Sequence, residues 1–366
     1  MLSLSEGKQY SEAAKFFAAN TIKKAIVQEW SILDLNVKLQ LNQYIFEFIA
    51  SVVLGGSVPS VTGAGSIMPP STWQKIVNQL LQSYAIIQKR SWIDEENGGR
   101  QFREMTYKHI QQLLTQDGSA VQKSQNLALQ ILLNLITEFS LGGHSSEIGM
   151  TWEFHEKSRI SFQEDFLSNC FVLGIDVLKR GLSIQDELLF SAQNNSSNDD
   201  ISELLKMSVN ALQLIGAVLT WDFSPFNEMS SFKSIVSTKM YKNRYASSGG
   251  GAGSAFLDQV KLNPKTKEWK DRFVDISTLK LLINFHQKFR QASPNAIDSE
   301  LFIRITHQVR SCLIQWCNIS NECFDGDESL KLNFFIGLLS SIFSLMNAYV
   351  LFWNYNIYHL IVPFPM

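Results

Sequence analysis

Cysteine, proline and charged residues are all scarce in this chain of 366 residues. The cysteines, Cys170, Cys312, Cys317 and Cys323, lack the paired spacing of zinc ligands, which argues against a structural metal site or a disulfide framework. Charged residues make up 18% of the chain, and the formal net charge is only -2. So small a charge gives no general attraction to nucleic acid or to an anionic membrane, so we expect no nucleic acid to be bound.

The alternation of apolar and polar residues that marks β-strands is nearly absent as well. Hydrophobic residues nevertheless make up 45% of the chain, which is ample material for a core. They recur at helical spacing, as Leu127, Ile131, Leu135 and Phe139 do, and Cys312 lies on one such apolar face. Helices of this kind are predicted over residues 13–30, 73–87, 102–114, 127–140, 161–178, 203–219, 269–289 and 301–316.

Successive helices without strands predict an all-α fold, and more specifically an α-solenoid of HEAT-type helix pairs. We expect a single array over residues 1–345 and a divergent hydrophobic tail over residues 346–366. Segments rich in glycine, serine, proline or asparagine are expected to be flexible loops inserted in the array, because they can bury little apolar surface. These insertions lie near residues 55–70, 191–200 and 246–256.

No combination of polar residues predicts an enzyme, a cofactor or a metal site. Four of the six histidines fall in separate helices and loops, where we expect surface or helix-face positions: His144, His155, His286 and His307. One group of acidic residues falls in a predicted linker and at the start of the next helix: Glu153, Glu156, Glu164 and Asp165. Acidic residues there complement the helix dipole, which is a structural role. The beginning, MLSLSEGKQYSEAAKFF, has no basic and apolar signal regions, so we expect a cytosolic start.

Several short motifs resemble the exportin-4 family of nuclear transport receptors, which belongs to the importin-β superfamily. The most specific is TWEFHEKSRISFQEDF, an irregular segment that follows the helix end LNLITEFS. The others occur in the family's order and are IVQEW (26–30), YAIIQKRSWID (84–94), VLTWDFSP (218–225), WKDRF (269–273) and NFHQKFRQ (284–291). Together the motifs cover most of the chain, from about residue 10 to residue 342.

The resemblance implies HEAT repeats curved into an importin-β-like superhelix. It also implies a nuclear export receptor that shuttles between nucleus and cytoplasm, binding the Ran GTPase in its GTP form, protein cargo and FG-repeat nucleoporins. The chain is far shorter than a full receptor and resembles its N-terminal part, so only a partial Ran site is expected. For an acidic partner surface, the basic residues to consider are Lys23, Lys24, Lys89 and Arg90, with a solvated face or a helix-dipole role as the alternative.

The C-terminal segment leaves several interpretations open. No Asp, Glu, Lys or Arg occurs from Leu332 to Met366, and residues 334–353 are about long enough to cross a bilayer. The segment could follow a truncated array, anchor the chain in a membrane, or form a buried helix that needs a partner. Asn347 and Asn354 make a membrane span unfavourable, and we expect the tail to promote association. Besides the export receptor, a general α-solenoid scaffold and a membrane-anchored helical protein remain as functional alternatives.

Overall fold

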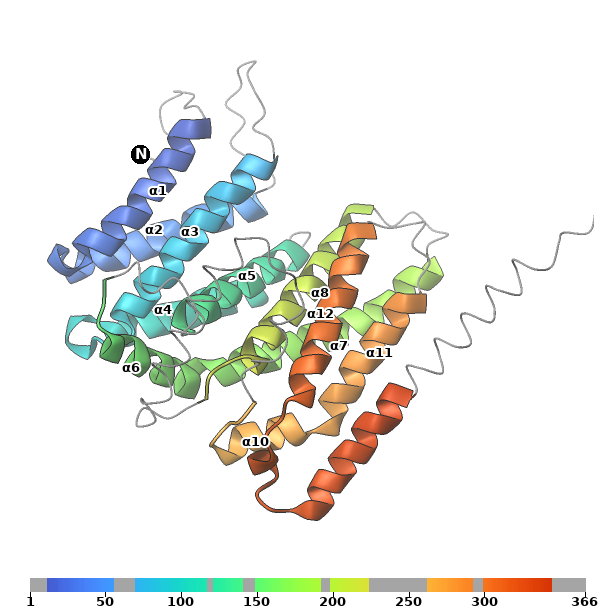
Figure 1. Ribbon diagram of the computed structural model, residues 1–366. Helices are drawn as coiled ribbons and strands as arrows, with labels where there is room; N and C mark the ends of the chain where they lie inside the picture. The colour runs from blue at the N-terminus through green and yellow to red at the C-terminus, as the bar shows by residue number, and fades with distance from the viewer. Residues whose placement is uncertain are drawn as a thin grey trace, which may run out of the picture. The chain divides into compact units, whose positions relative to one another are not determined.

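The computed structural model describes residues 12–55, 70–116, 121–140, 149–191, 198–223, 262–291 and 299–343. These residues are almost entirely helical (Figure 1). The only β-type pairing among them is an isolated bridge between Leu262 and Ile319. The all-α fold of the solenoid type is therefore confirmed. The chain divides into two compact units, Met1–Cys170 with Pro225–Arg244 and Phe171–Ser224 with Tyr245–Met366.

The first unit is built from successive helices that pack in pairs. They are α1 (Glu12–Glu29), α2 (Leu35–Leu54), α3 (Pro70–Ser91), α4 (Gly99–Leu114), α5 (Val121–Phe139), α6 (Trp152–Phe162) and the first residues of α7 (Ser168–Ser191). Helix α3 packs against α1, α2, α4 and α5, and α5 packs against α2, α4 and α6. The apolar stripe predicted on residues 127–139 is buried, because α5 has neighbours on several sides.

Helix α2 is one that the sequence pattern did not single out. Asp34 caps its N-terminus by accepting hydrogen bonds from the backbone N–H groups of Asn36 (2.9 Å) and Val37 (3.1 Å). Its sequence, LNVKLQLNQYIFEFIASVVL, begins with an alternation of polar and apolar residues, which blurs the helical period. The buried residues Ile45 and Ile49 show that the helical stripe runs along its second half.

A buried polar cluster joins α2, α3 and α4. Tyr84 is hydrogen-bonded through its hydroxyl to Nδ1 of His109 at 3.0 Å, and Nε2 of His109 lies 2.8 Å from Oε1 of Gln43. Burial lowers the pKa of His109 to about 4, so the ring is neutral near pH 7. Gln88 donates to Oδ1 of Asn42 at 2.8 Å beside them. These pairings satisfy polar groups that would otherwise be costly to bury.

The second unit contains α8 (Asn198–Leu219), α10 (Lys267–Val274), α11 (Ile276–Gln291), α12 (Ser299–Cys317), most of α7 and a last helix over residues 328–343. Helix α12 packs against α8 and α11. Cys312 is fully buried on α12, which confirms its predicted place in the core. The helix predicted over residues 269–289 is in fact two, because Asp275 adopts an extended conformation (φ -68°, ψ 105°) between α10 and α11.

The predicted loops and tail fall mostly outside the described residues. Residues 56–69, 192–197 and 246–256 are not described. Residues 198–200 form the start of α8, so the prediction of a loop there is wrong. Among the described residues, no helix is both long and apolar enough to cross a membrane. The predicted run over 334–353 is described only as far as residue 343, and the tail at 346–366 lies outside the described part.

We expect Trp316 to stabilise the fold through a hydrogen bond to the end of α10, next to the break at Asp275. Its buried indole Nε1 donates to the carbonyl oxygen of Phe273 at 2.8 Å, near the end of α10. Trp316→Phe removes this donor, so we expect the free energy of unfolding to fall by about 1–3 kcal/mol. Denaturant titration followed by circular dichroism measures the change. Ile303→Ala on the exposed side of α12 is the control, and an equal loss there would contradict the assignment.

Candidate functional site

Lys23 and Lys24 lie on α1, next to α3. Nζ of Lys23 donates to Oε1 of Gln82 at 3.1 Å, so this side chain is held against α3 and is only partly exposed. Lys24 is exposed. Helices α1 and α3 run in the same direction, since Lys15 lies over the ring of Trp73 at 5.1 Å, two turns before the Lys23 contact. The pair therefore presents positive charge from the middle of α1.

Lys89 and Arg90 do not extend that surface, because both are buried. They lie near the end of α3, about 10 Å further along the helix than Gln82. Nζ of Lys89 donates to the carbonyl oxygen of Glu138 at 2.6 Å and lies 3.7 Å from its Oε1. Burial lowers the pKa of Arg90. In this packing neither side chain can touch a partner surface, so the structure does not bring the four basic residues together.

Lys89 instead belongs to a cluster of buried ionisable groups from three helices. Burial lowers its pKa to about 8, and the nearby Glu138 of α5 opposes that shift. On α6, Nη2 of Arg159 pairs with Oε1 of Glu156 at 2.6 Å, and both side chains are buried. Burial and then the charge of Lys89 lower the pKa of His155 to about 4. The cluster links the end of α3, the end of α5 and α6.

Two expectations about the histidines and the acidic residues change in the structure. His155 and His286 are buried, not on the surface, while His307 is exposed and His144 lies outside the described residues. Glu156 pairs with Arg159, so its role is an ion pair in the interior. Glu153 does lie in the first turn of α6, as the dipole argument predicted. No sequence spacing could reveal that Lys89 meets a residue 49 positions away.

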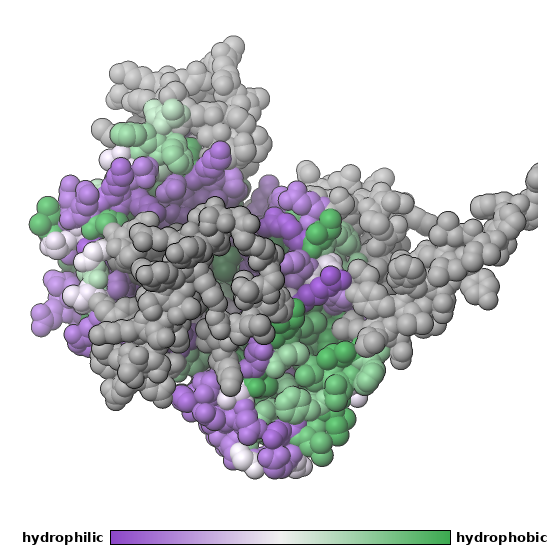
Figure 2. All heavy atoms as spheres, in the orientation of Figure 1, coloured by the Kyte–Doolittle hydropathy of each residue, from purple (hydrophilic) through white to green (hydrophobic). Residues whose placement is uncertain are grey.

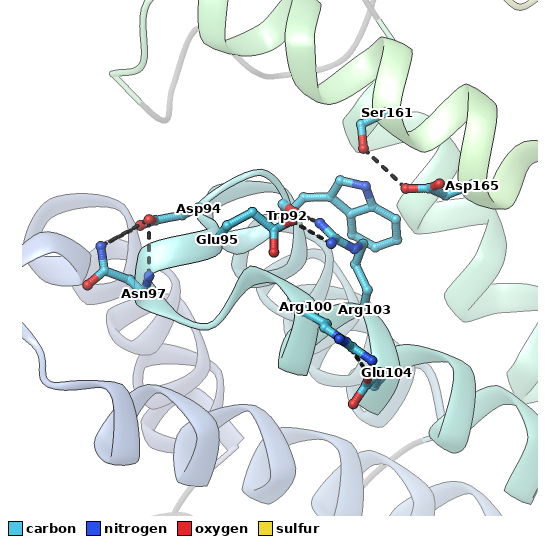
Figure 3. Close-up of polar contacts among 9 residues, drawn as sticks. All are labelled: Trp92, Asp94, Glu95, Asn97, Arg100, Arg103, Glu104, Ser161 and Asp165. Carbon is cyan, nitrogen blue, oxygen red and sulfur yellow. Dashed lines mark hydrogen bonds and ion pairs between the residues drawn. The ribbon is translucent and has the colours of Figure 1, made fainter.

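The turn after α3 is fixed by Arg103 and by two glycines. Arg103 of α4 donates to the carbonyl oxygen of Trp92 and pairs with Glu95, while Asp94 accepts from the side chain of Asn97 at 2.9 Å (Figure 3). Gly98 has φ +87°, a left-handed conformation that favours glycine. A Cβ atom on Gly99 would lie 2.7 Å from the carbonyl oxygen of Ser91, so the turn has no room for a side chain there.

This turn positions Trp92 at the centre of an aromatic cluster. Its fully buried ring lies 5.0 Å from that of Phe139, 5.4 Å from that of Phe162 and 5.9 Å from that of Phe166, measured between centroids. Phe139 ends α5, and the other two belong to the segment TWEFHEKSRISFQEDF. We call these residues the Trp92 cluster. It packs the end of one helix pair against the beginning of the next.

The TWEFHEKSRISFQEDF segment is helical from Trp152 onward. Its first part is therefore not the linker that we predicted, whereas the residues from Ser161 are helical as predicted. Thr151 caps α6, and the helix passes through a π-helical turn, Gln163–Leu167, directly into α7. A π-helical turn weakens the regular backbone ladder. The carboxylate of Asp165 accepts a hydrogen bond from Ser161 at 3.2 Å (Figure 3). The carbonyl oxygen of Asp165 also accepts a hydrogen bond from the hydroxyl of Tyr107 at 2.6 Å.

The polar and ionisable side chains at these positions pair with one another or pack in the interior. Among the described residues, no group of three or more His, Cys, Asp and Glu side chains could hold a metal ion. All four cysteines are free, and burial raises the pKa of Cys170 and of Cys312. A thiol with a raised pKa is mostly protonated near pH 7 and is a poor nucleophile.

The buried lysine predicts a rise in stability at alkaline pH. Between pH 8 and 10.5 the folded chain releases the proton of Lys89, while the unfolded chain still holds it, so the free energy of unfolding increases with pH. The gain is on the order of 3 kcal/mol. Urea titrations of the natural chain and of Lys89→Met across this range measure it as a difference. Lys24→Met is the matched control, and a pH-independent difference for Lys89→Met would contradict the burial argument.

Comparison with known proteins gives the same family as the sequence motifs. A model of the family described as Exportin-4 matches residues 4–356, which is nearly the whole chain. Exportin-4 from Dictyostelium discoideum is 22% identical over 215 residues, covering 57% of this chain. The matched region is 17% of that relative's length, so the chain corresponds to a small part of it.

The family match includes both compact units and the segment with the Trp92 cluster. It ends at residue 356, within the segment that was expected to be divergent. Since the match spans far more than half of the sequence and agrees with an all-α fold of stacked helices, the chain belongs to the exportin-4 family.

Proposed function

We propose that this chain is part of a nuclear export receptor that binds Ran in its GTP form together with protein cargo. Such a receptor crosses the nuclear pore through weak contacts with FG-repeat nucleoporins and shuttles between nucleus and cytoplasm. The observation that carries the proposal is the exportin-4 family match over residues 4–356. The absence of a metal cluster among the described residues is compatible with a function in binding.

The helical architecture supports this mode of action in physical terms. In a solenoid each helix pair contacts chiefly its neighbours, so small changes at successive contacts add up to a change of curvature. Two ligands that favour the same curvature strengthen each other's binding by a coupling free energy. Ran and cargo would be coupled in this way, with no chemical step.

For the contact with an acidic partner surface, we propose Lys23 and Lys24. Lys24 is exposed, and Lys23 is held in place by Gln82, so the positive charge on α1 is partly fixed before binding. Lys89 and Arg90 would require the packing around α3 to open before a partner could reach them. Their proposed role is therefore to support the fold beneath the surface.

Binding of Ran tests the transport proposal directly. We expect a receptor completed by its neighbouring repeats to be retained on GTP-loaded Ran and not on GDP-loaded Ran. A pull-down with purified proteins measures this, using this chain alone as a second sample for the partial site. If the completed receptor is not retained in either nucleotide state, the proposal fails, and a general helical scaffold becomes the better description.

The Lys24→Glu variant tests the surface on α1. Reversing an exposed charge at the edge of an interface chiefly slows association, so we expect binding of GTP-loaded Ran to weaken about threefold to tenfold. The loss should shrink at high salt, because exposed charges are screened. Lys280→Glu, at an exposed position of α11, is the matched control. Equal effects of the two variants in a binding titration would remove α1 from the proposed contact.

A further inference from the structure

The long helix that runs from Trp152 to Ser191 is irregular at one place. Helix α6 passes into α7 through the π-helical turn at Gln163–Leu167, with no loop between them. Such a turn interrupts the regular α-helical ladder and is often found at functional sites. Sharp bends in long helices occur at turns of this kind. The π-helical turn is therefore the place where this helix can bend most easily.

Aromatic side chains fasten the helix on both sides of the turn, each in a different cluster. Before the middle of the turn, Phe162 belongs to the Trp92 cluster. After the turn, the ring of Phe171 lies 5.7 Å from that of Phe273. The division between the two compact units falls between Cys170 and Phe171. The turn thus lies between two points that are fixed separately, so any bending between them must be taken up by a few residues.

One side of the turn is polar and open to solvent. Glu164, Asp165 and Asn169 are exposed there, so packing against another helix does not hold them. Exposed hydrophobic residues gather elsewhere, on the last described helix (residues 328–343) at the lower right of Figure 2. A bend that moves only the exposed side of the turn would bring little apolar surface into water.

Tyr107 of α4 contacts the turn from outside the helix. Its hydroxyl donates to the carbonyl oxygen of Asp165 at 2.6 Å, and its ring lies 4.7 Å from that of Phe166. Both partners belong to the π-helical turn itself. The side chain of Tyr107 is 39% exposed, so water can replace this hydrogen bond. Because the net gain from such a bond is small, the contact can favour one conformation of the turn and still open.

We propose that the π-helical turn is a hinge and that the Tyr107 contact holds it in one conformation. Loss of this contact lets α6 and α7 change direction relative to each other, while the aromatic clusters on both sides stay intact. A change of curvature is then concentrated at one point of the chain instead of being spread over all helix pairs. The hinge depends only on residues of this chain, so it stands or falls independently of the binding of Ran.

Distances between two spin labels test the hinge. Lys123 of α5 and Cys317 are exposed, and the other cysteines are buried, so Lys123→Cys gives the full chain a labelling site on each side of the turn. Tyr107→Phe removes the hydroxyl and keeps the ring. Because one hydrogen bond is lost, we expect the population of the bent form to rise about threefold to tenfold. A bend of about 20° moves the far side of a unit about 30 Å across by about 10 Å, which broadens the distance distribution measured by pulsed electron paramagnetic resonance.

Hydrogen exchange of the same proteins separates a hinge from a general loss of stability. In Tyr107→Phe, the amides of residues 163–169 should exchange faster, while those of α3 and α5 keep their natural rates. Tyr44→Phe on α2 is the matched control, since Tyr44 is 36% exposed, and it should leave distances and exchange unchanged. The proposal is overturned if Tyr107→Phe keeps the natural distance distribution, or if exchange also becomes faster throughout α3 and α5. An equal broadening in Tyr44→Phe would overturn it as well.

Discussion

Every helix of this chain must bury an apolar stripe against a neighbour, and the rest of the structure follows from that constraint. Helix α5 meets it fully, because α2, α3, α4 and α6 surround it. The helix over residues 328–343 meets it on one side only. A chain built in this way gains stability through contacts between successive elements, as solenoids do. Its surfaces are then free to vary in charge, because they do not carry the packing.

The Trp92 cluster shows how one helix pair is joined to the next in the first unit. A tight turn with two glycines brings Trp92 against Phe139, while α6 and its π-helical turn contribute Phe162 and Phe166. The neighbouring charged side chains Lys89 and Arg159 are buried only because each has an ionic partner. Removing one member of such a pair leaves the other charge uncompensated, so the junction depends on both kinds of contact.

Much of the fold could be predicted from the sequence, because helical periodicity records which residues face a neighbour. The burial of Cys312 and the stripe of α5 follow from that periodicity alone. Helical periodicity gave a wrong prediction over residues 269–289, where the chain breaks at Asp275 and forms two helices. The exposure of the basic residues was harder still to predict from the sequence. Lysine near a helix C-terminus is usually a surface feature, and only the fold shows that Lys89 meets α5.

Hydrogen exchange measured by mass spectrometry tests the central claim, that neighbouring helix pairs are joined into one cooperative unit by the Trp92 cluster. The account predicts that the amides of α5 and α6 exchange slowly in the natural chain. Trp92→Ala should accelerate exchange in both helices together, with α1 changing far less. If α6 alone becomes faster while α5 keeps its protection, the two helices open independently and the claim is contradicted.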